Sequence, residues 1–286
     1  MTTTQQPQTT LVLGGTGKTG RRVVQRLRAL DLPVRVGSRA GRPPFDWEDR
    51  ETWAPALEGA DAVYVSYYPD VSVPGAVDTV GAFARLAVAS GVPRLVLLSG
   101  RGEPEAELAE QAVRDSGAAL TVVRATWFAQ NFSEDYMLDY VLAGEVALPA
   151  GDIAEPFIDA DDIADVAVAA LTDDRHVGQV YELTGPRLLT FAQAVAEIAR
   201  ATGRDIRYVP VSIEEHAASS LAHGVPEEVV ELLTYLFSEV LDGRNAHVAD
   251  GVQRALGRAP KDFTDFALDA AASGVWEVPI ASGVPR

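Results

Sequence analysis

The sequence predicts an α/β fold in which a doubly wound parallel sheet is followed by a smaller, mainly helical C-terminal lobe. Short apolar runs alternate with longer amphipathic segments from Leu11 to about Arg124, which is the pattern of successive βα units. From Leu189 onward the pattern is mainly helical. A chain of 286 residues with 47% hydrophobic content is long enough for one large α/β domain, alone or with a smaller lobe.

The first half of the chain supplies the expected sheet and its helices. Buried parallel strands are continuous apolar runs, and such runs occupy residues 11–13, 34–36, 62–65, 95–98 and 120–123. Segments of helical length and mixed polarity lie between them, at residues 17–30, 77–90 and 105–116. Gly91 and Gly117 follow two of these helices, where a residue with positive φ often ends a helix.

The second half of the chain is less regular. Residues 128–142 carry aromatic side chains in a partly helical pattern, and a helix over residues 162–171 is expected to begin with Asp162 as its N-cap. Residues 180–183 form the next expected strand. The remaining expected helices cover residues 191–201, 214–223 and 227–241, with a last one from about Thr264.

The charge of the chain excludes several classes of partner. The sequence has 24 Lys+Arg against 41 Asp+Glu, a formal net charge of −17, and its only lysines are Lys18 and Lys261. Nucleic acids and anionic membranes are both bound by clustered basic residues, so neither is an expected partner. The sequence contains no apolar run of bilayer-spanning length and does not start like a signal peptide, so we expect a cytoplasmic protein.

We expect no metal site. The absence of cysteine removes thiolate ligands. The four histidines are widely separated, and surface positions are the simplest expectation for His216 and His223, although both fall in the lobe where substrate would bind. Asp159, Asp161 and Asp162 form a carboxylate cluster, which we interpret as structural.

The segment LVLGGTGKTG, residues 11–20, is the strongest functional motif. Its glycines at positions 14, 17 and 20 follow an apolar strand and open a helix. In a dinucleotide site Gly14 permits the tight turn, Gly17 the approach of a pyrophosphate, and Gly20 the close packing of the helix. The alternative is a merely structural turn, and the spacing does not match a P-loop. We expect an NAD(P)-binding domain of Rossmann type over residues 1–155, to which residues 156–186 return, and a substrate lobe over 187–286.

The end of the second strand indicates which dinucleotide is bound. NAD-specific folds place an acidic residue there against the ribose diol, whereas this chain has Gly37, Ser38 and Arg39. Arginine can pair with a 2′-phosphate, so the sequence favours NADPH (NADP+); a solvated loop arginine is the alternative. Asp46, followed by Trp47, could accept a hydrogen bond from the adenine amino group or could form an Asx turn.

The sequence resembles the NmrA-like group of atypical short-chain dehydrogenases, which includes NAD(P)H quinone reductases, triphenylmethane reductase and reductases related to festuclavine synthase. The resemblance rests on the segments GGTGKTG, VGSR, FDWEDRETW, RATWFAQNF, PFIDADDIADVA and YELTGPRLLTF. It implies that the cofactor phosphates are held by Gly14, Thr16, Gly17, Lys18, Thr19, Ser38 and Arg39, with Asp46 and Trp47 near adenine. It also implies that the ribose and nicotinamide are bordered by Tyr67, Tyr68, Ser99, Gly100 and Thr126 to Phe128.

One feature of ordinary short-chain dehydrogenases is missing. Those enzymes protonate the carbonyl oxygen with a tyrosine that lies four residues before a lysine. The residues four positions before Lys18 and Lys261 are Gly14 and Gly257, so the sequence contains no YxxxK. Hydride transfer remains possible because the cofactor performs it. Ser99, which aligns with an active-site serine of the family, could donate a hydrogen bond to the oxyanion or could cap local backbone.

The missing acid favours a substrate that stabilises its own negative charge. Quinones and conjugated phenolic ketones do so, and we expect such an aromatic acceptor to stack among Tyr67, Tyr68, Trp127, Phe128 and Tyr136; the alternative is that several of these are core residues. The leading hypothesis is an NADPH-dependent reductase of a conjugated ketone, quinone or iminium carbon, with a polyketide ketone in secondary metabolism as the first acceptor to try. A non-catalytic redox sensor of the NmrA type is the alternative, and a monomer or homodimer is expected.

Overall fold

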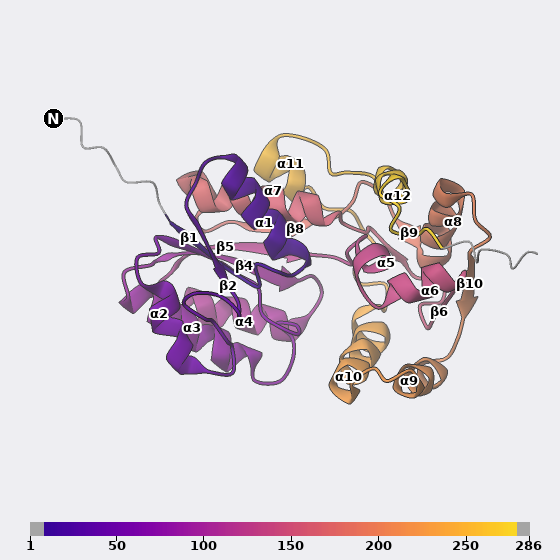
Figure 1. The fold of residues 1–286 in the computed structure, drawn as a ribbon, viewed down its shortest axis with the longest axis horizontal. Coiled ribbons are helices and arrows are strands. Elements are labelled where there is room, and N and C mark those ends of the chain that lie inside the picture. Colours follow the sequence, from indigo (N-terminus) through magenta and orange to yellow (C-terminus); the bar gives the residue numbers. More distant parts are fainter. Residues whose placement is uncertain (1–8, 279–286) are drawn as a thin grey trace, which may run out of the picture. The chain divides into compact units, whose positions relative to one another are not determined.

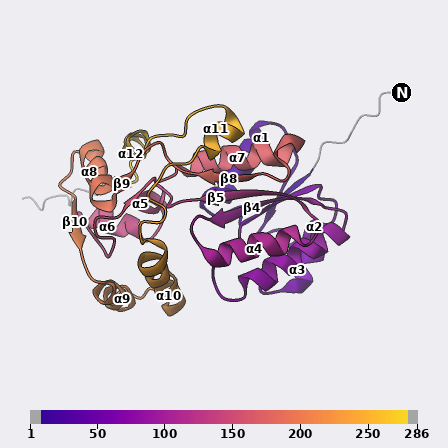
Figure 2. The same ribbon diagram turned by 180° about the vertical axis from the view of Figure 1, so that it is seen from behind.

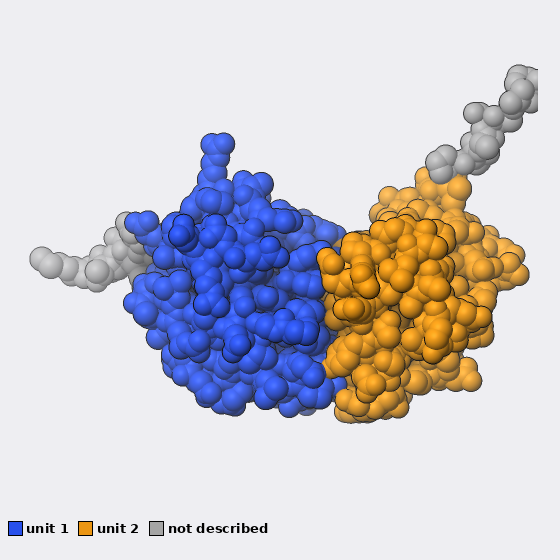
Figure 3. Space-filling view, turned by 90° about the horizontal axis from the view of Figure 1, so that it is seen from below, with its two compact units in different colours: residues 1–126, 160–186, 248–260 blue, residues 127–159, 187–247, 261–286 orange. Residues whose placement is uncertain are grey.

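The computed structural model describes residues 9–278 and divides the chain into two compact units. Unit 1 contains residues 1–126, 160–186 and 248–260, and unit 2 contains residues 127–159, 187–247 and 261–286 (Figure 3). This division differs from the expected boundary at residue 155, since residues 127–159 belong with the C-terminal unit and 248–260 with the N-terminal one. The two units are therefore built from interleaved parts of the chain.

Unit 1 is built on a six-stranded sheet in the order β2-β1-β3-β4-β5-β8, and every neighbouring pair is parallel (Figure 1). Its strands are β1 (Thr10–Leu13), β2 (Val34–Gly37), β3 (Ala62–Val65), β4 (Arg94–Gly100), β5 (Ala119–Ala125) and β8 (Val180–Leu183). Each contains one of the predicted apolar runs. The prediction of a doubly wound parallel sheet is confirmed.

Helices cover both faces of this sheet (Figures 1 and 2). One face carries α1 (Lys18–Ala29), α7 (Ala160–Thr172) and α11 (Gly251–Leu256); the other carries α2 (Trp53–Leu57), α3 (Ala76–Ala89) and α4 (Pro104–Arg114). The buried side chains of α3 and α4, among them Phe83 and Val113, pack on Leu95 and Leu97 of β4. Odd-numbered residues of β4 therefore face the α3 and α4 layer, because side chains alternate along a strand.

The start of α7 corrects one prediction. The helix begins at Ala160, so Asp162 lies in its first turn and is not the N-cap. Asp162 is buried and pairs with Arg258 (Nη1 to Oδ1, 2.6 Å), while Asp161 pairs with Arg22 (3.1 Å) and Arg26 (2.9 Å). Arginines therefore balance these two carboxylates within unit 1.

Unit 2 combines short strands with helices around an aromatic core. Its strands form two pairs, β6 (Glu145–Leu148) with β10 (Arg207–Pro210) and β7 (Ala154–Glu155) with β9 (Leu189–Thr190). Its helices are α5 (Asn131–Glu134), α6 (Met137–Ala143), α8 (Phe191–Thr202), α9 (Ile213–Ala222), α10 (Glu227–Tyr235) and α12 (Phe263–Ala272). Four buried phenylalanines meet in the core at centroid distances of 5.0 to 6.2 Å; they are Phe132, Phe157, Phe191 and Phe263.

Two expected helices of unit 2 are interrupted, and its strands were not predicted. The pattern over residues 128–142 divides into α5 and α6 because Asp135 has an extended backbone (φ −142°, ψ −168°). The expected helix over 227–241 is α10 followed by a π-helical turn, Leu236–Val240. The strands have two or four residues each, too short to give a clear alternating pattern. Within residues 9–278, no helix has the length and apolar character needed to cross a bilayer.

Candidate cofactor-binding edge of the sheet

The segments that follow β2, β1, β3 and β4 form what we call the carboxyl edge of unit 1. The strand order reverses at β1, which pairs with β2 on one side and β3 on the other, and Leu13 lies beside Gly37. In open α/β sheets, ligands bind beyond the carboxyl ends of the strands where the order reverses. The sheet topology therefore places the predicted cofactor residues at the usual ligand site of such folds.

The glycine-rich loop has the geometry that its spacing predicts. Gly14 has a positive φ of +63°, and its carbonyl accepts a hydrogen bond from Gly17 N at 2.8 Å. A Cβ on Gly20 would collide with that carbonyl, so the first turn of α1 can pack on the loop only with glycine. Gly17 is the N-cap of α1 and has no side chain to occupy the helix amides, and Thr16 and Gly17 are exposed. These features fit a bound pyrophosphate.

Thr19, one of the residues predicted to hold the cofactor phosphates, has a side chain with a structural partner. It is buried, and its hydroxyl accepts a hydrogen bond from Tyr64 Oη at 3.0 Å, which joins the first turn of α1 to β3. Thr19 shares its buried face of the helix with Val23 and Leu27. The neighbouring Lys18 is half-buried and opens the helix. Lys18 follows Gly17 at the N-terminus of α1, so it is the lysine that lies at the predicted phosphate site.

Ser38 and Arg39 emerge from the end of β2 next to the glycine loop. A Cβ on Gly37 would lie 2.6 Å from Leu13 Cδ2, so glycine is required for β2 to approach β1 at this point. The Ser38 carbonyl accepts hydrogen bonds from Gly41 N and Phe45 N, both at 2.9 Å, and this fixes the turn. Arg39 is exposed on it. A guanidinium held there suits a phosphate on the adenosine ribose.

Asp46 and Trp47 have local structural partners. Asp46 Oδ1 accepts a hydrogen bond from Glu48 N at 3.1 Å, which is an Asx turn and the alternative that the sequence left open. The indole of Trp47 donates to the Ser66 carbonyl at 3.2 Å and packs 4.9 Å from the Tyr67 ring and 5.3 Å from the Phe83 ring. Trp47 and Tyr67 thus form a partly buried aromatic wall that joins the loops after β2 and β3.

The other predicted residues of unit 1 lie at the ends of the central strands. Tyr68 is 76% exposed, directly after Tyr67. Gly100 is the last residue of β4 and pairs with Ala125 of β5, and Thr126 is buried, with its amide donating to the Leu183 carbonyl at 3.2 Å. These residues occupy the same edge of the sheet as the glycine loop.

Ser99 has a structural partner that the sequence did not reveal. It is 3% exposed, and its hydroxyl donates to Glu110 Oε1 of α4 at 2.8 Å. Glu110 is fully buried and also receives hydrogen bonds from Arg124 Nε (2.7 Å) and Nη2 (2.8 Å) and from Arg114 Nη2 (3.1 Å). The Ser99 side chain therefore points toward the helical layer beneath the sheet and stabilises a buried ion pair.

Two acidic residues at the carboxyl edge were not among the predicted site residues. Asp70, in the loop after β3, accepts hydrogen bonds from Ser72 N (2.8 Å) and Ser72 Oγ (2.7 Å) on Oδ1. Glu103 precedes α4 and is buried; burial and, to a lesser extent, the negative charge of Asp70 raise its pKa from 4.5 to about 8. The sequence signal that could have identified Glu103 is its place between the end of an expected strand and Pro104, which starts a helix.

Unit 2 holds the remaining predicted substrate residues. Trp127 is partly buried and packs 5.4 Å from Phe191 and 5.0 Å from Phe237, while Phe128 forms a β-bridge with Ile158. The hydroxyl of Tyr136 is buried with no hydrogen-bond partner among residues 9–278. These contacts support the alternative that part of the aromatic set belongs to a core.

His216 is buried rather than at the surface, contrary to the simplest expectation. Only 5% of it is exposed, and its ring lies 5.5 Å from Phe237. Burial lowers the pKa of this imidazole, and Nε2 has no hydrogen-bond partner among the described residues. The His216 ring therefore extends the aromatic contact of Trp127 with Phe237.

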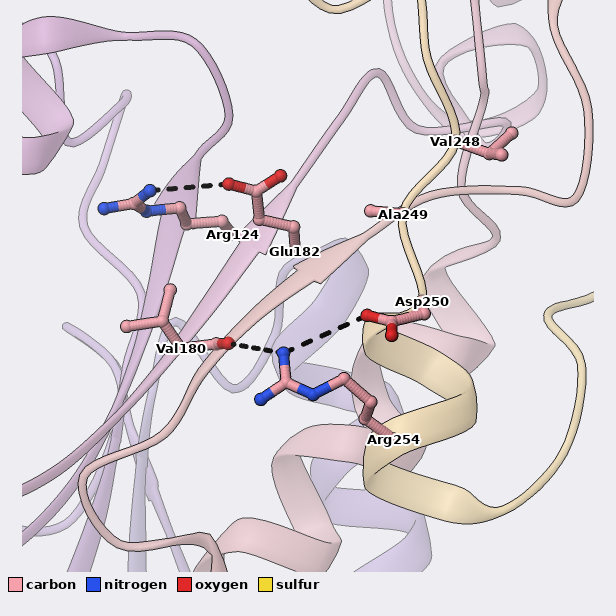
Figure 4. Close-up of a pocket in the computed structure, with 7 residues that line it drawn as sticks. All are labelled: Arg124, Val180, Glu182, Val248, Ala249, Asp250 and Arg254. Atoms are coloured by element: carbon pink, nitrogen blue, oxygen red, sulfur yellow. Dashed lines mark hydrogen bonds and ion pairs between the residues drawn. The ribbon is translucent and has the colours of Figure 1, made fainter.

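A separate hollow of about 600 Å³ lies beside β8 and α11 (Figure 4). Its charged residues are paired: Arg124 with Glu182 at 3.5 Å, and Arg254 with Asp250 at 4.0 Å and with the Val180 carbonyl at 3.4 Å. None of the predicted cofactor residues lines it. We therefore place the candidate site at the carboxyl edge, where the glycine loop and Arg39 lie.

Asp159, the remaining carboxylate of the acidic cluster, has partners in unit 2. Asp159 accepts a hydrogen bond from Gln130 Nε2 at 2.9 Å and lies 3.5 Å from Lys261 Nζ in unit 2. In the part of the chain from residue 9 to residue 278, no group of three or more His, Asp or Glu side chains is arranged to hold a metal ion.

Comparison with known proteins relates the chain to one family. A model of the NmrA-like family matches residues 105–267. The NAD(P)H azoreductase of Xenophilus azovorans is 33% identical over 288 residues, covering 92% of this chain and 98% of the azoreductase. The agroclavine dehydrogenase of Claviceps fusiformis is 32% identical over 279 residues, covering 91% of this chain and 96% of that enzyme. The structure of an Escherichia coli NADPH-dependent quinone oxidoreductase complexed with NADPH has a TM-score of 0.75 at 21% identity, over 90% of this chain and 98% of its own; this is a likeness of fold.

Ser99→Ala tests the structural role of the serine. We expect the free energy of unfolding to fall by about 1.5–3 kcal/mol, because a buried charged group loses a hydrogen-bond donor, and denaturant unfolding measures this loss. The exposed Ser90→Ala is the matched control and should change stability little. If Ser99→Ala left stability unchanged but lowered reductase turnover by roughly 10² or more, the serine would be an oxyanion donor after all.

Proposed function

The chain belongs to the NmrA-like family, and we propose that within it the chain acts as an NADPH-dependent reductase of a conjugated ketone, quinone or iminium carbon in an aromatic substrate. Among its relatives are an NAD(P)H azoreductase and an agroclavine dehydrogenase, each aligned over more than nine tenths of this chain. A polyketide ketone in secondary metabolism is the acceptor that we propose first. The proposal includes a cytoplasmic location and a monomer or homodimer.

The observation that carries the proposal is the glycine loop at the point where the strand order reverses. Gly14, Gly17 and Gly20 leave the N-terminal amides of α1 open to a pyrophosphate. Arg39 stands on the adjacent turn, where a guanidinium would pair with a 2′-phosphate and an acidic residue would have favoured NADH. NADPH, when bound, supplies a hydride to an electrophilic carbon, and the residues of this chain orient the cofactor for that transfer.

The choice of acceptor rests on the acid that the chain lacks and on its aromatic side chains. The sequence has no YxxxK, so substrates whose reduced oxygen is strongly basic are disfavoured, and a delocalised anion is favoured. In unit 1, Tyr67 and the exposed Tyr68 follow β3 at the carboxyl edge. In unit 2, Trp127 and Phe237 form a further aromatic pair. Each of these aromatic faces, taken by itself, suits a flat aromatic substrate.

Oxidation of NADPH against a panel of quinones, polycyclic ketones and imines tests this function. We expect NADPH absorbance to fall in proportion to the acceptor consumed with at least one compound of the panel. Tight NADPH binding without turnover of any acceptor would contradict a reductase and favour a nucleotide-binding regulator.

Arg39→Glu tests the preference for NADPH. We expect the Kd for NADPH to rise roughly 10-fold or more, since charge-assisted hydrogen bonds to the phosphate are lost and repulsion replaces them, while the Kd for NADH changes little. Fluorescence titration measures both constants. Arg28→Glu is the control, because Arg28 is exposed near the end of α1. Equal losses of both nucleotides in Arg39→Glu would rule out a role in reading the 2′-phosphate.

A further inference from the structure

Glu103 occupies the N-cap of α4 but does not cap it. Its backbone is extended (φ −108°, ψ 107°), and its side chain makes no hydrogen bond to the helix amides. A carboxylate at that position normally gains from the helix dipole and from a capping hydrogen bond. The side chain instead turns back onto the end of β4, where its carboxyl fills the space that a Cβ on Gly100 would occupy. Glycine at position 100 thus makes room for the acid.

The surroundings of Glu103 oppose its ionisation. The residue is 8% exposed, and its Oε2 has no hydrogen-bond partner among residues 9–278. The charged groups that act on it are Asp70, from the loop after β3, and Glu105, from the first turn of α4; both are acidic. Only the hydroxyl of Ser72 favours the ionised form. A buried carboxyl without a cation is held neutral, because a bare charge there would cost several kcal/mol.

Asp70 connects this buried acid to the carboxyl edge. It is half-buried, and Ser72 holds one of its oxygens through two hydrogen bonds. β3 and β4 are parallel neighbours, with Val65 beside Leu97, so the loops that leave their carboxyl ends meet. Tyr67 and Tyr68 stand on the same loop as Asp70. The two carboxyls therefore lie at the edge where the proposed cofactor and acceptor would react.

We propose that Asp70 and Glu103 share one proton and deliver it to the reduced substrate, in place of the tyrosine that YxxxK would have supplied. This inference rests on the proposed reductase function. With a ketone acceptor, the carbonyl carbon gains the hydride and the electrons of the C=O π bond move to the oxygen. The shared proton moves from Glu103 to Asp70, the more exposed of the two, and from Asp70 to that oxygen. The pair is left with two ionised carboxylates, and a proton from water restores it.

Infrared difference spectroscopy during a pH titration tests the shared proton without any substrate. The wild-type protein should show a carboxylic acid that ionises near pH 8, well above the ordinary glutamate pKa of 4.5. Glu103→Gln should remove that signal, and Asp70→Asn should move it to lower pH, because one source of repulsion is gone. Asp115→Asn, an exposed acidic residue at the far end of α4, is the matched control and should retain the signal unshifted. Absence of any such acid in the wild type would overturn the proposal.

The same titration has a consequence for stability. The folded-state pKa of Glu103 lies above its unfolded value, so between pH 4.5 and about 8 the folded protein binds more protons than the unfolded chain. Its contribution to the free energy of unfolding is therefore present at low pH and is lost as pH rises through that window. Glu103→Gln, which keeps the shape and cannot ionise, should flatten this slope. This readout also shows that the variant folds.

Steady-state kinetics tests whether the proton of the Asp70 and Glu103 pair takes part in the reaction. With an accepted substrate, kcat should fall as pH rises through about 8 in the wild type, and Glu103→Gln should lower kcat by about 10²-fold or more and lose that limb of the profile. Asp115→Asn should keep both the wild-type kcat and the fall in kcat near pH 8. An unchanged kcat and pH profile in Glu103→Gln would overturn the role of the pair alone. Failure of the wild type to oxidise NADPH with any acceptor would instead overturn the proposed function, and with it this role.

Discussion

The parallel pairing of β1 with β2 on one side and β3 on the other is the constraint on which the candidate site depends. It sets Leu13 beside Gly37 and Val12 beside Tyr64, so the loops after all three strands leave from the same edge. The glycine loop, the turn that carries Arg39 and the loop that carries Asp70 are neighbours for this reason. The close approach of α1 to the glycine loop and of β2 to β1 requires glycine, because a side chain at Gly20 would collide with the loop and one at Gly37 with Leu13. The glycines preserve the geometry that the pairing creates.

Much of this arrangement could be predicted from the sequence, because apolar runs and glycine spacing are local signals. All six strands of the main sheet and the turn before α1 follow from them. The directions in which single side chains point do not follow from these local signals. Ser99 stands at a strand end, as predicted, but it shares the face of Leu95 and Leu97 and meets Glu110, eleven residues away on a helix. Likewise Thr19 lies on the buried face of α1, so it bonds to Tyr64 rather than facing the loop. Such partners are set by tertiary packing, which spacing does not encode.

Two glutamates associated with α4 show how environment gives one residue type two roles. Glu110 is fully buried, yet Arg124 and Arg114 surround its carboxylate and Ser99 completes its hydrogen bonds, so it serves as an anchor between the sheet and the helix. Glu103 is nearly as buried and has acidic neighbours in place of arginines, so the favoured form is the neutral acid. Neither of the two lysines follows a tyrosine at the YxxxK spacing, so this chain does not lower the pKa of a tyrosine in the usual way. A carboxyl kept neutral by burial is another way to store a proton at neutral pH.

The central claim is that this chain transfers hydride from a nicotinamide to an aromatic acceptor at the carboxyl edge of the sheet. Reduction of a ketone or imine, whose reduced carbon keeps the transferred hydride, with NADPH deuterated at C4 in separate samples for the two faces, followed by mass spectrometry of the product, tests it most directly. The account predicts one deuterium on the reduced carbon from one of the two labelled cofactors and none from the other. Product that carries no deuterium from either cofactor, or no product with any acceptor, would contradict it.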